Sequence, residues 1–362
     1  MSVRVEPPGY PREWEADVLL SDGSMARLRP IRPDDAQRLV DFYDRVSPES
    51  KFLRFFAPYP RLSEKDVARF TQVDYVDRVA LIVSLADQII AVGRYDRAED
   101  EEAEVAFLVE DAHQGRGIAQ LLLEHLAEAA RERGIKKFVA EVLPQNRRMA
   151  SVFADAGYRV SKGVSDGVLM VEFPILPTNT SVGVMERREH RAESAAVQRL
   201  LAPQRVVVLG QGDRVQRLVQ AMLAGGFRGE VVAICTDGGP VHGVRCAPSV
   251  ARLEGTIDLA IVSVPTADMG SVVIDVAHKG AHAMVVLTGT DLHLEDSRTV
   301  VSLARAYGVR ALGPDALGLV NTRPDVSLNA TPAPMPRLGS VGLFCQSAAV
   351  GVVLLKEALG RD

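Results

Sequence analysis

Apolar and polar positions along the chain fall into two blocks, divided by a polar and charged segment. In the first block, alternating and apolar runs predict a hairpin around Asp22-Gly23-Ser24, followed by strands and helices in turn. The longer predicted strands are Val79–Ser84, Ile89–Tyr95, Ala103–Glu110, Lys137–Leu143 and Val168–Phe173. Amphipathic spacing predicts helices at Gly117–Arg133 and Arg147–Ala156.

The second block alternates more regularly, and its predicted strands are almost entirely apolar. These strands are Val206–Leu209, Val231–Cys235, Leu259–Val264, Met284–Leu287 and Arg310–Leu312. Strands that are apolar on both faces and separated by helical stretches are typical of a parallel sheet covered by helices on both sides.

The two blocks predict a division into domains. We expect a first domain over residues 1–175, a linker over 176–202, a second domain over 203–335 and the start of a further domain over 336–362. Val197, Leu200 and Leu201 recur at helical spacing, so the linker is expected to end in a helix. Because the sequence stops soon after the further domain begins, we expect the chain to be a portion of a longer protein.

Composition and charge restrict the possible functions. The chain has 47 acidic against 42 basic residues and a net charge of -5, so it lacks the basic surface typical of nucleic-acid binding. Its first residues lack the apolar run of a signal peptide, and no stretch of it approaches the length needed to cross a membrane. Its three cysteines form no paired framework and have no metal-ligand spacing. These features predict a cytoplasmic protein without a metal site.

A glycine-rich segment, Gln114-Gly115-Arg116-Gly117-Ile118-Ala119, joins a predicted strand to the next helix. Glycine lets the backbone approach a ligand closely, and the first turn of a helix presents N–H groups without intrahelical partners. Those donors and the helix dipole favour a phosphate or pyrophosphate, and Arg116 adds a charged donor. Taken alone, the segment fits equally well a helix start in which the glycines only permit a tight turn.

The segment resembles the signature of the GNAT superfamily of N-acetyltransferases. Gln114, Gly117 and Ala119 match its Q/R-x-x-G-x-G/A pattern. The family's second pattern, N…A…Y/F…G-F/Y, is matched by Asn146, Ala150, Phe153, Gly157 and Tyr158. The resemblance covers roughly residues 18–175 and implies a mixed, mainly antiparallel sheet with helices on both faces.

This resemblance implies acetyl-CoA as the cosubstrate. Its pyrophosphate would lie on the amides of residues 114–119, and its pantetheine arm along Leu108 and Val109, which part from the next strand near Asn146. The residues implied to hold acetyl-CoA are Leu108, Val109, Gln114, Gly115, Arg116, Gly117, Ile118, Ala119 and Asn146.

Acyl transfer to an amine requires the neutral amine, whereas a free lysine titrates near pH 10. A carboxylate is therefore expected to act as general base, directly or through water. Glu104 is the candidate, because similar protein acetyltransferases have their catalytic glutamate in the same A-E-[VF]-A context. The alternatives are that Glu104 only continues the acidic run Glu99–Glu102, or that Glu110 is the base, although Glu110 lies near the pyrophosphate loop.

One position departs from the family pattern. Many similar enzymes have a tyrosine that protonates the leaving thiolate where this chain has Phe153. Phe153 cannot donate a proton, so we expect water to do so, and we interpret Tyr158 as a packing residue.

The second block resembles the CoA-binding domain of NDP-forming acyl-CoA synthetases and succinyl-CoA ligase, which implies a Rossmann-like parallel sheet. Residues 336–362 look like the start of that family's next domain. The turn Gly210-Gln211-Gly212 lacks the third glycine of a full dinucleotide-binding fingerprint, because position 215 is valine. Two places depart from the synthetase pattern: Asp315-Ala316 replaces the usual N-C, and Cys345-Gln346-Ser347-Ala348 replaces Ser-Gln-Ser-Gly. No histidine matches the family's phosphorylated one. The block is therefore expected to lack ligase activity, and either to bind a nucleotide or CoA effector or to be a degenerate regulatory scaffold.

A GNAT domain joined to a synthetase-like region resembles the bacterial Pat protein acetyltransferases. This implies a protein lysine Nε-acetyltransferase that inactivates AMP-forming acyl-CoA synthetases by acetylating their catalytic lysine. The alternatives are an acetyltransferase for small amines or protein N-termini, and a CoA-metabolite sensor without turnover. Acceptor specificity is expected in segments such as Phe52–Leu62, which either contacts a partner protein or packs over the acceptor channel.

Overall fold

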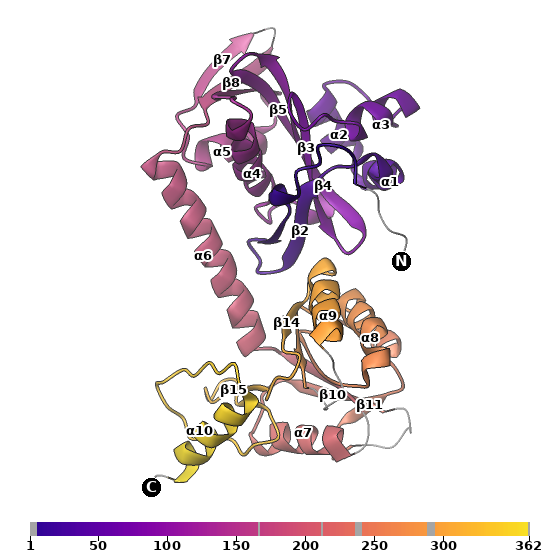
Figure 1. Cartoon of the computed structure of the whole chain (residues 1–362), viewed down its shortest axis with the longest axis vertical. Coiled ribbons are helices and arrows are strands. Elements are labelled where there is room, and N and C mark those ends of the chain that lie inside the picture. The colour runs from indigo at the N-terminus through magenta and orange to yellow at the C-terminus, as the bar shows by residue number, and fades with distance from the viewer. Residues whose placement is uncertain (1–5, 166, 211–212, 236–240, 288–293, 361–362) are drawn as a thin grey trace. The chain divides into compact units, whose positions relative to one another are not determined.

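The computed structural model describes residues 6–165, 167–210, 213–235, 241–287 and 294–360. The chain divides into two compact units, which are treated separately below (Figure 1). One consists of Met1–Asp22 and Ala26–Glu193, and the other of Gly23–Met25 and Ser194–Asp362. The division between them falls inside the predicted linker.

The first unit is built on a mixed sheet in the order β1-β2-β3-β4-β5-β6-β8-β7. The pairings from β2 to β5 are antiparallel, β5 pairs with β6 in parallel, and β8 pairs antiparallel with both β6 and β7. The strands are β1 (Ala16–Leu19), β2 (Met25–Pro30), β3 (Arg78–Leu85), β4 (Gln88–Glu99), β5 (Glu102–Val109), β6 (Lys137–Val142), β7 (Ser161–Ser165) and β8 (Val168–Pro174).

Helices cover both faces of this sheet (Figure 1). They are α1 (Ala36–Arg45), α2 (Pro48–Phe55), α3 (Glu64–Thr71), α4 (Ile118–Glu132) and α5 (Arg147–Asp155), with short 3₁₀ segments at Arg12–Trp14, Pro33–Asp35 and Asp111–His113. Side chains along β3 point alternately to the two faces of the sheet. Val79, Leu81 and Val83 pack in the core under α4, while Ala80 and Ile82 pack under α1.

The pairing of β5 with β6 covers only the beginning of the two strands. Its register runs from Glu102 opposite Lys137 to Glu104 opposite Val139. Beyond that point β5 continues to Val109 paired with β4, and β6 continues to Val142 paired with β8. The two strands therefore part in the middle of the sheet.

The second unit contains a parallel sheet in the order β11-β10-β9-β12-β13-β14. Its strands are β9 (Arg205–Gly210), β10 (Glu230–Ile234), β11 (Arg245–Ala247), β12 (Leu259–Ser263), β13 (Ala283–Val286) and β14 (Arg310–Leu312). Side chains alternate along β9: Val207 and Leu209 face one core, and Val206 and Val208 face the other. The predicted fold class is thus confirmed for both units.

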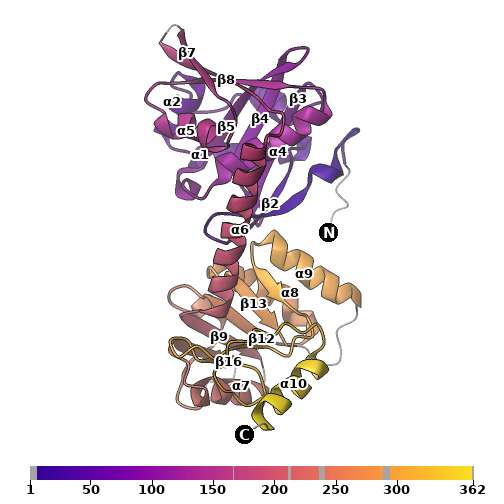
Figure 2. The same cartoon turned by 90° about the vertical axis from the view of Figure 1, so that its left-hand side faces the viewer.

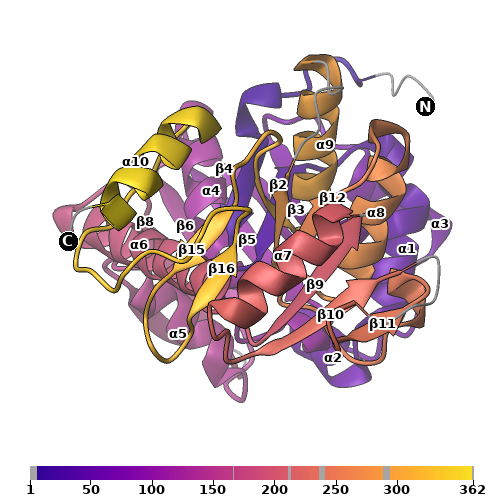
Figure 3. The same cartoon turned by 90° about the horizontal axis from the view of Figure 1, so that it is seen from below.

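Helices lie on the two faces of the parallel sheet, as Figure 2 and Figure 3 show. Helix α7 (Asp213–Ala224) covers one face, and α8 (Thr266–His278) and α9 (Leu294–Ala306) cover the other. The remaining elements are a 3₁₀ segment at Val250–Arg252, the antiparallel pair β15 (Leu319–Asn321) and β16 (Leu328–Ala330), and α10 (Ala348–Gly360).

Several elements differ from the sequence prediction. Helix α6 (Asn179–Leu201) occupies nearly all of the predicted linker, instead of only its end. Residues Phe52–Phe55, at the start of the segment expected to set acceptor specificity, belong to α2. Strand β7 was not predicted, because all five of its residues are exposed and it has no buried face to set an apolar alternation.

Neither a spanning helix nor a metal cluster is found in the described part of the chain. None of the helices there combines the length and the apolar character needed to cross a bilayer. The same residues include no group of three or more His, Cys, Asp or Glu side chains placed to hold a metal ion.

A buried ion pair connects β2 to α1. Arg29 donates to both carboxylate oxygens of Asp35 at 2.6 and 2.7 Å, and the two residues are 7% and 1% exposed. The backbone N–H of Arg32 donates to the same carboxylate at 2.9 Å. Burial alone would raise the pKa of Asp35, but the hydrogen bonds and charge of Arg29 outweigh it and the pKa is lowered.

We therefore predict that Asp35→Asn destabilises the first unit by about 3 kcal/mol, because Arg29 is left buried without its counter-ion. Since the folded-state pKa lies below the unfolded value of about 4, this stabilisation is complete above about pH 4 and is lost as the pH falls further. Denaturation followed by fluorescence of Trp14, the only tryptophan of the chain, reports on this unit. The matched control is Asp34→Asn at an exposed position, and equal losses from the two variants would contradict the prediction.

Candidate active site

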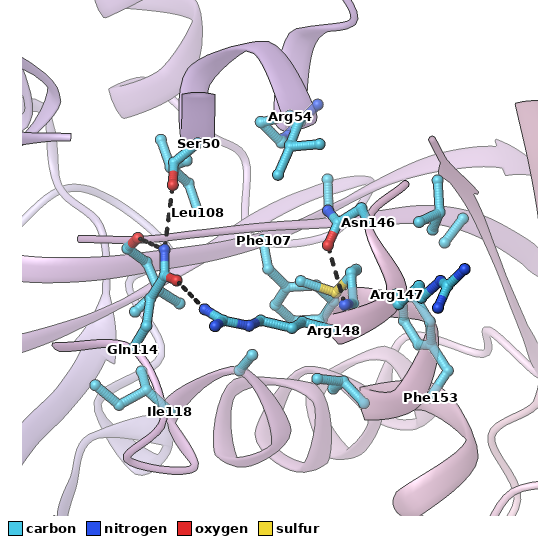
Figure 4. Close-up of a pocket in the computed structure, with 18 of the residues that line it drawn as sticks. Ser50, Arg54, Phe107, Leu108, Gln114, Ile118, Asn146, Arg147, Arg148 and Phe153 are labelled. Atoms are coloured by element: carbon cyan, nitrogen blue, oxygen red, sulfur yellow. Dashed lines mark hydrogen bonds between the residues drawn. The ribbon is translucent and has the colours of Figure 1, made fainter. Parts of the chain in front are cut away.

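A cavity of ≈ 930 Å³ occupies the split between β5 and β6 (Figure 4). It is within the size range of small-molecule sites, about 300–1,000 Å³. Its walls come from β5, β6, the loop before α4, the start of α5, and α2. The lining residues on which the argument depends are Ser50, Arg54, Glu104, Leu108, Val109, Gln114, Gly115, Gly117, Ile118, Ala119, Glu141, Asn146, Arg147, Arg148 and Phe153.

The parted strands present backbone groups to this cavity. Residues 105–109 of β5 pair with β4 on one edge, and residues 140–142 of β6 pair with β8 on the other. Their facing edges carry N–H and C=O groups that need hydrogen-bond partners. An extended ligand with amide groups can bond to these edges as an added strand would. The predicted ligand residues Leu108 and Val109 lie on this edge of β5.

The loop before α4 gives the cavity a set of open N–H groups. Gly115 and Gly117 have φ values of 77° and 75°, a region that glycine adopts without strain. Gly117 is the N-cap of α4 and has no side chain to cap the helix, and its carbonyl accepts the helical bond from Leu121. The N–H groups of Ile118, Ala119 and Gln120 have no partner within the helix and line the cavity, as an anion site requires.

Gln114 holds this loop in place by hydrogen bonds to its surroundings. Its Nε2 donates to the carbonyl of Val109 at 3.3 Å and to Ser50 Oγ at 3.2 Å. Its Oε1 accepts from Arg148 at 3.3 Å (Figure 4). The amide therefore ties the loop to β5, α2 and α5.

The guanidinium of Arg116 does not lie where the sequence predicted it, as a charged donor to the ligand. Its side chain forms an ion pair with Asp22 at 2.9 Å and contacts Nδ1 of His113 at 2.8 Å, and it is not among the residues that line the cavity. Burial, and then the charge of Arg116, lower the pKa of His113. The ring is accordingly neutral near pH 7, and its Nδ1 accepts the hydrogen bond.

Other arginines, which the sequence analysis missed, line the cavity instead. Arg147 and Arg148 lie at the start of α5, and Arg54 lies on α2 (Figure 4). The position of Arg147 and Arg148 directly after Asn146 was a usable signal, because Asn146 belongs to the second family pattern. Asn146 itself caps α5, with Oδ1 accepting from the backbone N–H of Met149 at 3.1 Å.

Glu104 lies where β5 and β6 separate, and its side chain is exposed in the cavity. Its neighbours Ala103 and Val105 belong to the core under α4, so Glu104 faces the side covered by α2 and α3. Burial lowers the pKa of Arg54, and the charge of Glu104 is the leading effect that opposes this shift. The carboxylate and the guanidinium are thus close enough to interact.

The other candidates for proton transfer differ in whether they reach the cavity. Glu110 is buried, forms an ion pair with Arg45 at 3.0 Å and does not line the cavity. Glu141 on β6 does line it, and its side chain is exposed. Phe153 is 1% exposed and packs between the rings of Phe107 and Phe173.

Tyr158 is outside the group of residues that line the cavity. Its ring stacks on Phe173 with the centroids 5.4 Å apart. This arrangement agrees with a packing role.

Two family models match the chain. The Acetyltransferase (GNAT) family matches residues 42–158, and the CoA binding domain matches residues 204–322. The first match contains the cavity loop, Glu104 and Asn146, and the second contains the parallel sheet.

Individual relatives match part of the chain. The GNAT domain of S. lividans PAT, a crystal structure, is 59% identical over 46% of this chain and 99% of that chain, with a TM-score of 0.44. Acetyltransferase Pat of Mycolicibacterium smegmatis is 30% identical over 45% of this chain and 50% of its own length. The alpha subunit of an ADP-forming acetate–CoA ligase II of Pyrococcus furiosus is 30% identical over 34% of this chain, which spans 27% of that subunit.

We predict that Arg148→Gln weakens the binding of CoA about fivefold. This factor corresponds to the loss of roughly 1 kcal/mol of binding free energy, the contribution expected of a charged contact at an exposed site. Arg116→Gln should leave the affinity nearly unchanged, because that guanidinium is held by Asp22 outside the cavity. Isothermal titration of the two variants with CoA provides the comparison. A larger loss for Arg116→Gln than for Arg148→Gln would reverse this assignment of the two arginines.

Proposed function

Because the chain belongs to the acetyltransferase (GNAT) family, we propose that it transfers an acetyl group from acetyl-CoA to the Nε amine of lysine side chains in another protein. The observation that carries the proposal is the cavity in the split sheet, which has open N–H groups of α4 at one end and Glu104 at the other. The five residue-to-residue steps along β5 from Glu104 to Val109 span about 16 Å. An anionic group and a reacting centre can therefore bind at well-separated places.

The residues of the split sheet fit acetyl-CoA. The loop and first turn of α4, residues 114–119, would bind the diphosphate through backbone N–H groups. The edges of β5 at Leu108 and Val109 and of β6 would bond to the amides of the pantetheine arm. Asn146, as the cap of α5, fixes the far wall near that arm. The bound cosubstrate would supply the acetyl group as an activated thioester.

In this proposal Glu104 acts as the general base. It would accept the proton of the lysine ammonium, directly or through one water, so that the neutral amine can attack the thioester carbonyl. The leaving thiolate would take its proton from water, because Phe153 has no hydroxyl and its ring is packed between two phenylalanines.

A protein acceptor is supported by the similarity to two Pat acetyltransferases. We propose an AMP-forming acyl-CoA synthetase, inactivated at its catalytic lysine, as that acceptor. Residues of Phe52–Leu62 take part in the cavity wall, since Leu53, Phe55 and Phe56 line it. This supports the alternative in which the segment packs over the acceptor channel. We further propose that the protein acts in the cytoplasm, a compartment in which cysteine thiols remain reduced.

The second unit is proposed to bind a nucleotide or CoA effector, on the basis of its match to a CoA binding domain. The glycine-rich turn that prompted this idea lies partly outside the described residues, which exclude 211 and 212. At Gly210 a Cβ atom would lie 2.7 Å from the carbonyl oxygen of Ser263. The close packing of β9 and β12 thus requires a glycine at this position whether or not a ligand binds.

The test is acetylation of a purified AMP-forming acetyl-CoA synthetase, mapped by mass spectrometry. We expect the wild-type chain to acetylate the catalytic lysine and Glu104→Gln to be about 10²–10⁴ times slower, the usual contribution of a general base. Glu104→Gln should still bind acetyl-CoA. The matched variant is Glu141→Gln, which removes the other exposed glutamate of the strand pair that borders the cavity.

A larger loss of rate in Glu141→Gln than in Glu104→Gln would assign the base to β6. If the wild type modifies neither the synthetase nor a panel of small amines while still binding acetyl-CoA, the chain is a sensor without turnover.

A further inference from the structure

A small side chamber adjoins the main cavity of the first unit. Its volume is ≈ 30 Å³, about twice the 10–15 Å³ that a cavity needs to hold one water molecule. It shares Arg54, Phe55, Ala106 and Leu108 with the main cavity and is also lined by Arg94, Tyr43 and Phe70, among others. The chamber therefore admits a group of the size of a single carboxylate.

Two guanidinium groups converge on this chamber. Cζ of Arg94 lies 4.1 Å from the centroid of the Phe70 ring, and its Nη2 donates to the Phe70 carbonyl at 3.4 Å. Cζ of Arg54 lies 5.0 Å from the centroid of the Phe55 ring. Within the described residues, neither arginine has a carboxylate within ion-pair distance. The aromatic rings thus hold both cations in place and leave their charge without a direct counter-ion.

Two acids lie near this pair without forming an ion pair with it. Asp96 is held by Arg78 at 3.2 Å, and Glu104 acts on Arg54 only at longer range. Burial, and then the charge of Arg54, lower the pKa of Arg94 to about 9, against the opposing effect of Asp96. Burial likewise lowers the pKa of Arg54. An anion in the chamber would stabilise the charged form of both guanidinium groups and would itself be stabilised by them.

The chamber lies on the Glu104 side of the main cavity. In the β4–β5 register Arg94 stands opposite Ala106, and Asp96 stands opposite Glu104. Ala106 is two residues from Glu104 along β5, which corresponds to about 7 Å. The N-terminus of α4, in contrast, lies beyond Val109 at the other end of β5. A group in the chamber is therefore near the amine that Glu104 would deprotonate, and far from the proposed diphosphate site.

We propose that Arg54 and Arg94 bind a carboxylate of the acceptor, carried by an Asp or Glu side chain close in sequence to the lysine that is acetylated. This inference rests on the proposed function. The planar guanidinium groups suit a carboxylate, which they can bind through parallel N–H···O bonds. An acceptor without this carboxylate would bring its lysine ammonium towards two cations that have no direct counter-ion. The repulsion between the charges disfavours binding of such an acceptor.

The experiment compares synthetic peptides that have one lysine and either Asp or Asn at each flanking position in turn, with acetyl-CoA as donor. We expect wild-type kcat/KM to be about tenfold higher with Asp at one or two of these positions. Arg94→Gln should abolish this preference by lowering the rate on the Asp peptide, and Arg94→Glu should favour a flanking Lys or Arg in its place. Arg69→Gln, which removes a charge at an exposed position of the adjacent helix, should retain the preference for Asp.

The outcomes separate this inference from the function on which it rests. Acetylation without an acidic preference, or with a preference that Arg94→Gln leaves intact, overturns the inference alone. Failure to acetylate both the peptides and the synthetase overturns the proposed function. If only the folded synthetase is acetylated, the same comparison is made by changing each acidic residue that flanks its modified lysine to the amide.

Discussion

The first unit depends on one constraint, which is that β5 and β6 pair at their beginnings and then part. Each strand keeps one fully paired edge, β5 with β4 and β6 with β8, so the sheet remains continuous on both sides of the gap. Aromatic packing fills the space below it. Phe153 lies between Phe107 of β5 and Phe173 of β8, with ring centroids 6.1 and 5.2 Å away.

This packing also explains the departure from the family pattern at Phe153. The side chain is 1% exposed and surrounded by apolar rings, so a hydroxyl there would have to reach the cavity to find a partner. An unpaired buried hydroxyl costs about 1–3 kcal/mol. In this chain the position serves the packing of the split, and under the proposed function solvent would protonate the leaving group.

The signature loop shows why a sequence motif and a ligand contact are different things. Gln114 matches the family pattern, yet its amide is used in bonds to Val109, Ser50 and Arg148 that fix the loop. Arg116 lies in the middle of the motif and points to Asp22. In the proposed complex the loop would contact its ligand through backbone N–H groups, which the glycines and the helix start predict without knowledge of any side chain.

The sequence predicted the two folds and most of the cavity, because these follow from local patterns. Apolar runs located the strands of both sheets, and the two family patterns located the walls at Gln114 and Asn146. The sequence could not predict that Arg54 and Arg94 meet. They are separated by forty residues, and their proximity depends on how α2 packs against β4 and β5, which no periodicity records. The length of helix α6 was underestimated, because its many exposed polar positions hide the apolar stripe that marks a helix.

Charge connects the cavity to its side chamber through Arg54, which lines both. The guanidinium interacts electrostatically with both Glu104 and Arg94. The chamber residue Ala106 follows Glu104 by two positions on β5, about 7 Å along the strand. An acceptor carboxylate bound in the chamber would therefore bring the neighbouring lysine to the Glu104 end of the cavity, away from the proposed diphosphate site. Recognition of the acceptor and removal of the proton from its amine would thus depend on the same short stretch of β5 and on the one arginine that borders both places.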